Sequence, residues 1–270
     1  MKYDSFSERL WWQVAVALLA LIPIFLVAQV LDARTVNDIS VWIKPQKFSV
    51  SLGLHFVTLA ILASLFADKV RRSWWMIGLA VSSVVAVIAE QFIMTFQSAR
   101  GVASHFNFET QLDQILYALM GLGALLLIFP ALIMGFRFLF APTSEKLTPG
   151  LKMGAALGLI LGYFLTLGLA GYMSSFTDGH WVGGVRSDAN GLPIFGWARD
   201  GGDLRVAHFF ATHLMQAVPL AGYLADRTFG SESAMPKIIA IVAALAGAAI
   251  TVGTFLQDMA GEPFLGFLGG

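Results

Sequence analysis

Apolar runs long enough to cross a lipid bilayer recur along almost the whole of this sequence. A transmembrane helix needs about 20 consecutive apolar residues. Inside hydrocarbon its backbone N–H and C=O groups must be satisfied within the protein, as an α-helix allows. The runs are each bounded by charged residues, Gly or Pro, and lie near 10–31, 49–67, 74–97, 113–137, 152–174, 206–225 and 237–257. The sequence therefore predicts an all-α fold, a polytopic membrane bundle of about seven transmembrane helices.

Composition agrees with a membrane protein and excludes several chemistries. Hydrophobic residues make up 57% of the chain and charged residues 13%, whereas a soluble domain carries about 25% charged residues. The net charge is zero, so we expect membrane lipid and not nucleic acid as a partner. Cysteine is absent, which excludes disulfides, thiolate metal sites and cysteine nucleophiles and leaves nitrogen and oxygen as the ligands for any metal.

The ends of the runs define the expected domain organisation. The first run reaches Leu31 without a small-residue cleavage site and is longer than the core of about 7–15 residues in a secretory signal, so we interpret it as the first span. The joints are short except for residues 174–204, which are rich in Gly, Asp and Trp. We expect that segment, the 174–204 loop, to form an ordered, turn-rich cap or hairpin on the outer side. No internal repeat is evident, so a single domain over 1–270 is predicted.

Basic residues predict the orientation. Lys69, Arg71 and Arg72 lie within four residues after the second run, and short loops rich in Lys and Arg stay cytoplasmic. This orientation places ten of the 17 basic residues inside and seven outside. We therefore expect a cytoplasmic N-terminus and a C-terminus on the outer side of the membrane.

The seven outward basic residues oppose the orientation that the others support. They are Arg34, Lys44, Lys47, Arg100, Arg186, Arg199 and Arg205. Each could reach the headgroups from the end of a span. Alternatively, they bind an anionic or lipidic small molecule on the outer face.

The fifth run carries glycines at a spacing of four. Gly154, Gly158 and Gly162 therefore lie on one helix face, where small residues let helices approach closely in membranes. We predict that this pattern serves packing and carries no chemistry.

Three ionisable residues are expected at membrane depth, where each costs a few kcal/mol on insertion scales. They are His55, Glu90 and His213. Counting 1.5 Å per residue places each roughly 10–15 Å below the outer surface. We predict that they converge on one pocket, with Glu90 and His213 as the candidate catalytic residues. The simpler alternative is that each imidazole or carboxyl bonds to an unrelated neighbour.

Further polar side chains follow the outer ends of the same helices and are expected to line the pocket or its rim. Five of them are expected only to line the pocket: Gln97, His105, Asn107, Asp203 and Gln216. His208 joins His55 and His213 as a candidate metal ligand. Lys44, Lys47, Arg100 and Arg205 would neutralise an anionic cofactor.

Two resemblances accompany these residues. The segments WIKPQKFSVSLGLHF, RGVASHFN and GDLRVAHFFATHLMQ resemble a group of bacterial polytopic inner-membrane proteins without an established activity, through the motifs KPxKF, RGxxSHFN and GDLRxxHF. The resemblance covers most of the second, third and sixth runs. It implies only the fold and the compartment, which is the bacterial inner (cytoplasmic) membrane, so the expected C-terminus would be periplasmic. Separately, Ser51 and His55 form an S-x-x-x-H pattern similar to the second-helix motif of seven-helix zinc hydrolases of the alkaline ceramidase type. That family pairs two histidines as H-x-x-x-H, whereas His208 and His213 are five residues apart.

Four functions remain open. The first is redox or electron transfer through haem b or a transition metal held by His55 and His213, with the outward cations on the haem propionates. The second is a zinc-dependent lipid hydrolase with Glu90 as general base. The third is a proton-coupled transporter of a small solute in which Glu90 carries the proton. The fourth is an accessory membrane subunit whose polar groups serve helix association.

Overall fold

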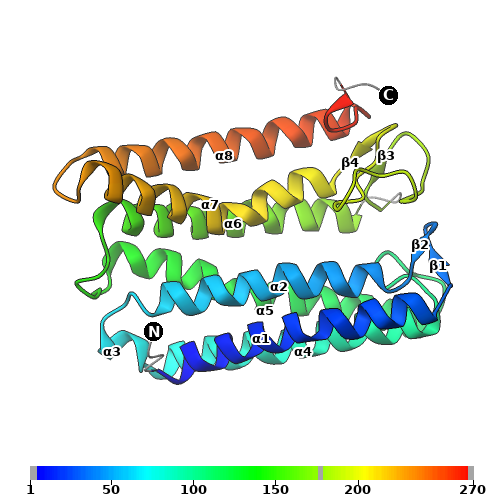
Figure 1. Cartoon of the computed structure of the whole chain (residues 1–270), viewed down its shortest axis with the longest axis horizontal. Helices are drawn as coiled ribbons and strands as arrows, with labels where there is room; N and C mark the ends of the chain where they lie inside the picture. The colour runs from blue at the N-terminus through cyan, green and yellow to red at the C-terminus, as the bar shows by residue number, and fades with distance from the viewer. Residues whose placement is uncertain (1–4, 176–178, 267–270) are drawn as a thin grey trace. The chain divides into compact units, whose positions relative to one another are not determined.

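Helices account for nearly all the regular structure of residues 5–175 and 179–266, the part of the chain described by the computed structural model (Figure 1). The predicted all-α bundle is confirmed. The sequence predicted one domain, and the structure forms two compact units that are described separately below. Unit 1 comprises Met1–Met134 and Phe140–Leu147, and unit 2 comprises Gly135–Leu139 and Thr148–Gly270.

Unit 1 consists of helices and one short hairpin. Helix α1 packs on both α2 and α4, and α2 also packs on α4. The hairpin, β1 with β2, is antiparallel and connects α1 to α2. The elements in chain order are α1 (Phe6–Leu31), β1 (Thr35–Val36), β2 (Ile39–Ser40), α2 (Ile43–Ala63), α3 (Asp68–Arg71), α4 (Trp74–Arg100) and α5 (Gln111–Phe140).

Unit 2 is built on three helices that pack against one another, α6 with α7, α7 with α8 and α6 with α8. An antiparallel hairpin, β3 with β4, lies in the 174–204 loop, as expected of an ordered loop, although residues 176–178 lie outside the described residues. The elements are α6 (Pro149–Ser175), β3 (Trp181–Val182), β4 (Gly202–Asp203), α7 (Arg205–Phe229) and α8 (Met235–Met259).

Six of the described helices are long and apolar enough to cross a membrane: α1, α2, α4, α5, α6 and α8. The remaining long helix, α7, coincides with the sixth predicted run, but its His, Thr and Gln residues make it more polar than the others. The seventh span therefore stays a prediction. Helix α2 begins at Ile43, so Lys44 and Lys47 lie in its first turns and not ahead of it.

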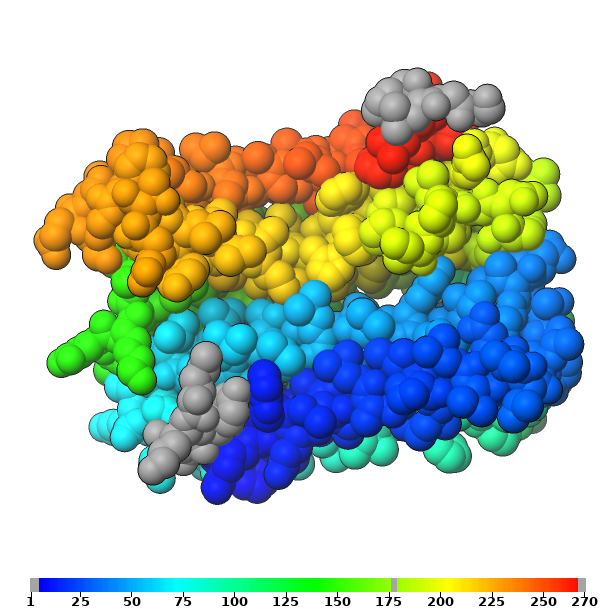
Figure 2. Space-filling view, viewed as in Figure 1, coloured from blue at the N-terminus to red at the C-terminus, as the bar shows by residue number. Residues whose placement is uncertain are grey.

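Apolar side chains face outward along these helices, as a lipid-facing surface requires. Figure 2 shows α1 lying along one face of unit 1, where Ile24, Val27 and Val30 are 60%, 58% and 85% exposed. On α8 of unit 2, Leu245 and Leu256 are 64% and 62% exposed. Large apolar side chains exposed in such number mark a surface that meets lipid or a partner and not water. The chain thus has the character of a helical membrane protein.

Glycines on α6 let its backbone approach that of α7. A Cβ added at Gly154 would lie 2.5 Å from Val218 O, and one added at Gly158 would lie 2.6 Å from Leu214 O. Both distances are shorter than real Cβ contacts, so only glycine fits. The predicted packing role of this glycine spacing is confirmed.

A carboxylate from the end of α7 caps the start of α6. Asp226 accepts hydrogen bonds from the backbone N–H groups of Gly150 at 2.9 Å and Leu151 at 2.7 Å, and from the hydroxyl of Thr148. The first N–H groups of a helix lack partners within the helix and carry its positive dipole end. Asp226 therefore satisfies both needs while joining the two helices.

Substitution Asp226→Ala should lower the free energy of unfolding by about 2–3 kcal/mol, because two backbone donors and one hydroxyl lose a charged acceptor. The measurement is unfolding of the detergent-solubilised protein by added sodium dodecyl sulfate, followed by tryptophan fluorescence. Asp226→Asn keeps one accepting oxygen and should lose less. Equal stability of wild type and Asp226→Ala would show that the cap contributes nothing.

Candidate functional site

A carboxyl group lies in the interior of unit 1 with an incomplete set of partners. Glu90, on α4, is 4% exposed, and its Oε1 accepts no hydrogen bond among the described residues. It lies ten residues before Arg100, the last residue of the helix, which is about 15 Å along the axis. Glu90 is therefore far from either end of an apolar helix, where an ionisable group invites a functional explanation.

Glycine on α5 makes room for this carboxyl. A Cβ added at Gly123 would lie 2.5 Å from Glu90 Oε1 and 3.3 Å from its carboxyl carbon. Any other residue at this position would displace the Glu90 side chain. Helices α4 and α5 of unit 1 thus both contribute to the surroundings of Glu90.

Other buried polar atoms on α2 and α4 also have no partner among the described residues. Gln91 donates from Nε2 to Pro45 O at 3.5 Å, which is long, and its Oε1 accepts no bond. Ser49 lies one turn beyond Pro45 on the same face of α2, and its buried hydroxyl has no partner either. Unpartnered buried polar atoms are uncommon in folded proteins, so this part of unit 1 departs from ordinary helix packing.

His55 is held by the backbone of α5. Its Nε2 lies 3.1 Å from Leu127 O, and because a carbonyl oxygen only accepts, Nε2 must carry the hydrogen. The arrangement corresponds to the simpler alternative for His55, a buried imidazole bonded to backbone.

The end of unit 1 where α4 stops and α5 starts holds a charged cluster. Arg100 donates from Nη1 to Asp113 Oδ1 at 2.6 Å, and Gln97 donates to the same oxygen from Nε2 at 2.8 Å. The side chain of Asp113 is 2% exposed. Arg100 and Gln97 therefore bind a carboxylate of the protein itself. The roles expected for them were to neutralise an anionic cofactor and to line the pocket, respectively.

Two other rim residues shape the connection between α4 and α5. His105 Nδ1 lies 3.1 Å from Ser104 Oγ, and its imidazole packs 5.6 Å from the ring of Phe48. Asn107 donates from Nδ2 to Ala103 O at 3.0 Å and accepts from Glu109 N at 3.2 Å. Lys47, like Lys44, is half-buried near the start of α2.

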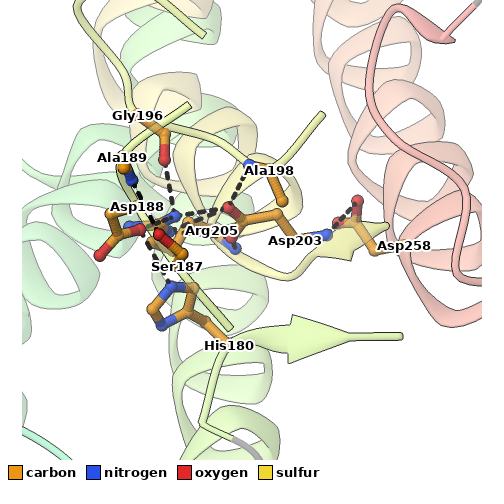
Figure 3. A network of polar contacts seen from close by, with 9 residues as sticks. All are labelled: His180, Ser187, Asp188, Ala189, Gly196, Ala198, Asp203, Arg205 and Asp258. Carbon is orange, nitrogen blue, oxygen red and sulfur yellow. Dashed lines mark hydrogen bonds and ion pairs between the residues drawn. The ribbon is translucent and has the colours of Figure 1, made fainter. Parts of the chain in front are cut away.

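Unit 2 has a polar network around Arg205, at the start of α7 (Figure 3). Arg205 binds Asp203 through Nε at 2.9 Å and through Nη2 at 2.6 Å, and binds Asp188 Oδ1 through Nη2 at 2.7 Å. Asp203 also accepts from the N–H of Ala198 at 2.9 Å. The network therefore fastens the 174–204 loop to the first turn of α7.

Two further side chains extend the network. His180 Nε2 lies 3.6 Å from Asp188 Oδ1, and Asp258, on α8, accepts from Asp203 N at 3.3 Å (Figure 3). Burial lowers the pKa of His180, which keeps the imidazole neutral. Burial by itself would raise the pKa of Asp188, but His180 and the charge of Arg205 outweigh it and lower this pKa. Asp188 is thus ionised and paired with Arg205.

The remaining predicted residues of unit 2 lie along α7. His213 Nδ1 lies 3.2 Å from Gln216 Oε1, and its imidazole packs 4.2 Å from the ring of Phe209. His208 has a buried Nδ1 without a hydrogen-bond partner in the described part of the chain. His213 and Gln216 therefore contact each other, as residues three apart in a helix can.

The predicted site residues divide between the two units. Unit 1 holds Lys44, Lys47, His55, Glu90, Gln97, Arg100, His105 and Asn107, and unit 2 holds Asp203, Arg205, His208, His213 and Gln216. Within residues 5–175 and 179–266, no three His, Asp or Glu side chains form a group that could hold a metal. Haem or metal binding by His55 and His213 stays a prediction.

Sequence reasoning missed the partners of several residues. No motif accompanies Gly123 or Asp258, each of which lies in an apolar helix. The loop that contains His180 and Asp188 has many polar residues, so neither stands out. No spacing in the sequence relates Gly123 to Glu90 or Asp258 to Asp203. The sequence shows only that Gly123 is a glycine within a predicted span and that Asp258 is a carboxyl near the end of one.

Comparison with protein-family models, with curated proteins and with solved structures found no match to this chain.

Proposed function

We propose that the protein couples the passage of a small solute across the membrane to the movement of protons, with Glu90 as the group that binds and releases the proton. The observation that supports this proposal is the buried Glu90 carboxyl with its unbonded Oε1. A purely structural carboxyl in this position would be expected to have its oxygens satisfied, as those of Asp113 are.

The physical basis is the free energy of a charge in hydrocarbon. An ionised carboxylate without hydrogen-bond partners is strongly disfavoured there, so the closed site tolerates the protonated form. When water or a cationic solute reaches the carboxyl, the ionised form becomes acceptable and the proton can leave. Proton occupancy would then depend on whether the site is open, as coupling requires.

Helix α5 has sequence features that favour bending next to Glu90. Gly123 lies against Glu90, and Pro130 removes a backbone hydrogen bond two turns further on. Proline is a common cause of kinks in long helices. We propose that α5 bends near these residues to open the carboxyl to one side of the membrane.

The test measures proton movement in reconstituted vesicles. Purified protein is placed in liposomes that contain a pH-sensitive dye, and organic cations, organic anions and sugars are added outside in turn. We expect at least one solute class to change the internal pH. Glu90→Gln should reduce this change at least tenfold, because an amide cannot exchange a proton.

Glu109→Gln is the matched control, since Glu109 is exposed in the connection between α4 and α5 and should be dispensable. Full solute-linked proton movement in Glu90→Gln, or none with any solute in the wild type, would contradict the proposal. The same preparation distinguishes the other hypotheses. An intense Soret band would favour haem, and one bound zinc per chain would favour hydrolysis.

A further inference from the structure

A pocket of about 220 Å³ opens at one end of unit 1, away from Glu90. It lies where the start of α1 meets the segment between α3 and α4. The lining residues share this location and are Ser5, Phe6, Arg9, Arg71, Arg72 and Ile77. Three of the six are arginines, from two separate parts of the chain.

One of these arginines is fixed by the protein. Arg71 binds both carboxylate oxygens of Glu8, through Nε at 2.7 Å and Nη2 at 2.8 Å, and also Asp68 at 3.0 Å. The Glu8 side chain is fully buried and that of Arg71 is 12% exposed. A bidentate contact of this kind holds the guanidinium plane in one orientation. Arg71 therefore forms a rigid wall of the pocket.

The other two arginines differ from Arg71 in being exposed. Arg9 and Arg72 are exposed, and neither forms an ion pair or a side-chain hydrogen bond within the described ranges. Two uncompensated charges beside one cavity repel each other unless an anion lies between them. Their side chains are thus available for a ligand.

Surrounding features locate the pocket at the level of lipid headgroups. Phe6 and Trp74 are 48% and 84% exposed next to it, and aromatic side chains are enriched where a membrane meets water. Both α1 and α4 begin here, so their N–H groups and positive dipole ends add to the basic field. The volume corresponds to about seven water molecules at roughly 30 Å³ each, enough for a phosphate and part of the headgroup attached to it.

We propose that this pocket binds a phosphate group, presented by an anionic phospholipid of the adjoining leaflet. Arg9 and Arg72 contact the phosphate oxygens, and Arg71, whose guanidinium is already paired with Glu8 and Asp68, forms the fixed wall beside them. Guanidinium forks match phosphate geometry and favour it over a single-point cation contact. The site is independent of Glu90 and of the transport proposed above.

The experiment counts bound lipid on the full-length protein by native mass spectrometry in dodecyl maltoside, with phosphatidylglycerol or phosphatidylcholine added. We expect the wild type to retain one phosphatidylglycerol more tightly than phosphatidylcholine. The double variant Arg9→Gln/Arg72→Gln should weaken phosphatidylglycerol binding about 30-fold, since each basic residue near a headgroup contributes roughly fivefold.

The control Arg227→Gln/Lys237→Gln removes two exposed cations from unit 2 and should bind phosphatidylglycerol as the wild type does. Circular dichroism verifies that each variant is folded. Inorganic phosphate forms the second arm: displacement of the lipid by millimolar phosphate would assign the site to free phosphate, and resistance to it would assign the site to lipid. Equal retention of phosphatidylglycerol by wild type and the double variant would overturn the proposal.

Discussion

Substitution Arg205→Met should lower the free energy of unfolding by about 3 kcal/mol and release the 174–204 loop from α7. The side chains of Asp203 and Asp188 are 1% and 6% exposed, and both bind the Arg205 guanidinium. Removing one partner from a buried ion pair leaves charge without compensation, which typically costs 3–5 kcal/mol. We expect the lower end of this range because the Arg205 side chain is itself 28% exposed.

Arg199→Met is the matched control, since Arg199 is an exposed arginine of the same loop. Unfolding by sodium dodecyl sulfate is followed by tryptophan fluorescence, to which Trp181 and Trp197 contribute from within the loop. We expect Arg199→Met to unfold as the wild type does. Similar midpoints for the two variants would show that the network in Figure 3 does not hold the loop.

Substitution Gly158→Leu should destabilise unit 2 by about 3 kcal/mol, at the upper end of the usual cost of overpacking. The new Cβ would lie 2.6 Å from Leu214 O. A backbone oxygen cannot turn aside as a side chain can, so α6 and α7 must separate. The same unfolding assay should show an earlier midpoint together with lower yield of folded protein.

Gly168→Leu provides the comparison on the same helix. A Cβ at Gly168 meets no atom within 4 Å, so the substitution should be neutral or stabilising by up to about 0.8 kcal/mol through helix propensity. Because both variants replace glycine by leucine in α6, the difference between their stabilities measures the effect of close packing, without the effects of helix propensity and hydrophobicity. If Gly158→Leu behaves as Gly168→Leu does, the approach of α6 to α7 is not what requires glycine.

The helices could be predicted because a bilayer imposes length and composition on every span. The run predicted near 237–257 became Met235–Met259, and the run near 74–97 became Trp74–Arg100. Local spacing also predicted that Gly154, Gly158 and Gly162 share one face of a helix, which packs closely on α7. In each case the residues that determine the helix or the contact lie close together in the sequence.

The surroundings of the candidate residues could not be predicted, because they depend on how each helix is rotated about its axis. The pairing of His55 with Leu127 O joins residues 72 apart, and the pairing of Asp226 with Gly150 N joins residues 76 apart. No periodicity encodes such pairs. The sequence therefore marks Glu90 as an unusual residue but does not mark Gly123 as the residue beside it.

Carbodiimide labelling tests whether Glu90 is a proton-binding carboxyl sealed within the membrane region. Dicyclohexylcarbodiimide enters lipid and reacts with protonated carboxyl groups, and mass spectrometry of peptides locates the adduct. The account predicts an adduct on Glu90 with this reagent, and none on Glu90 with a water-soluble carbodiimide that labels the exposed Glu109. Labelling of Glu90 by the water-soluble reagent, with none by the lipid-soluble one, would contradict it.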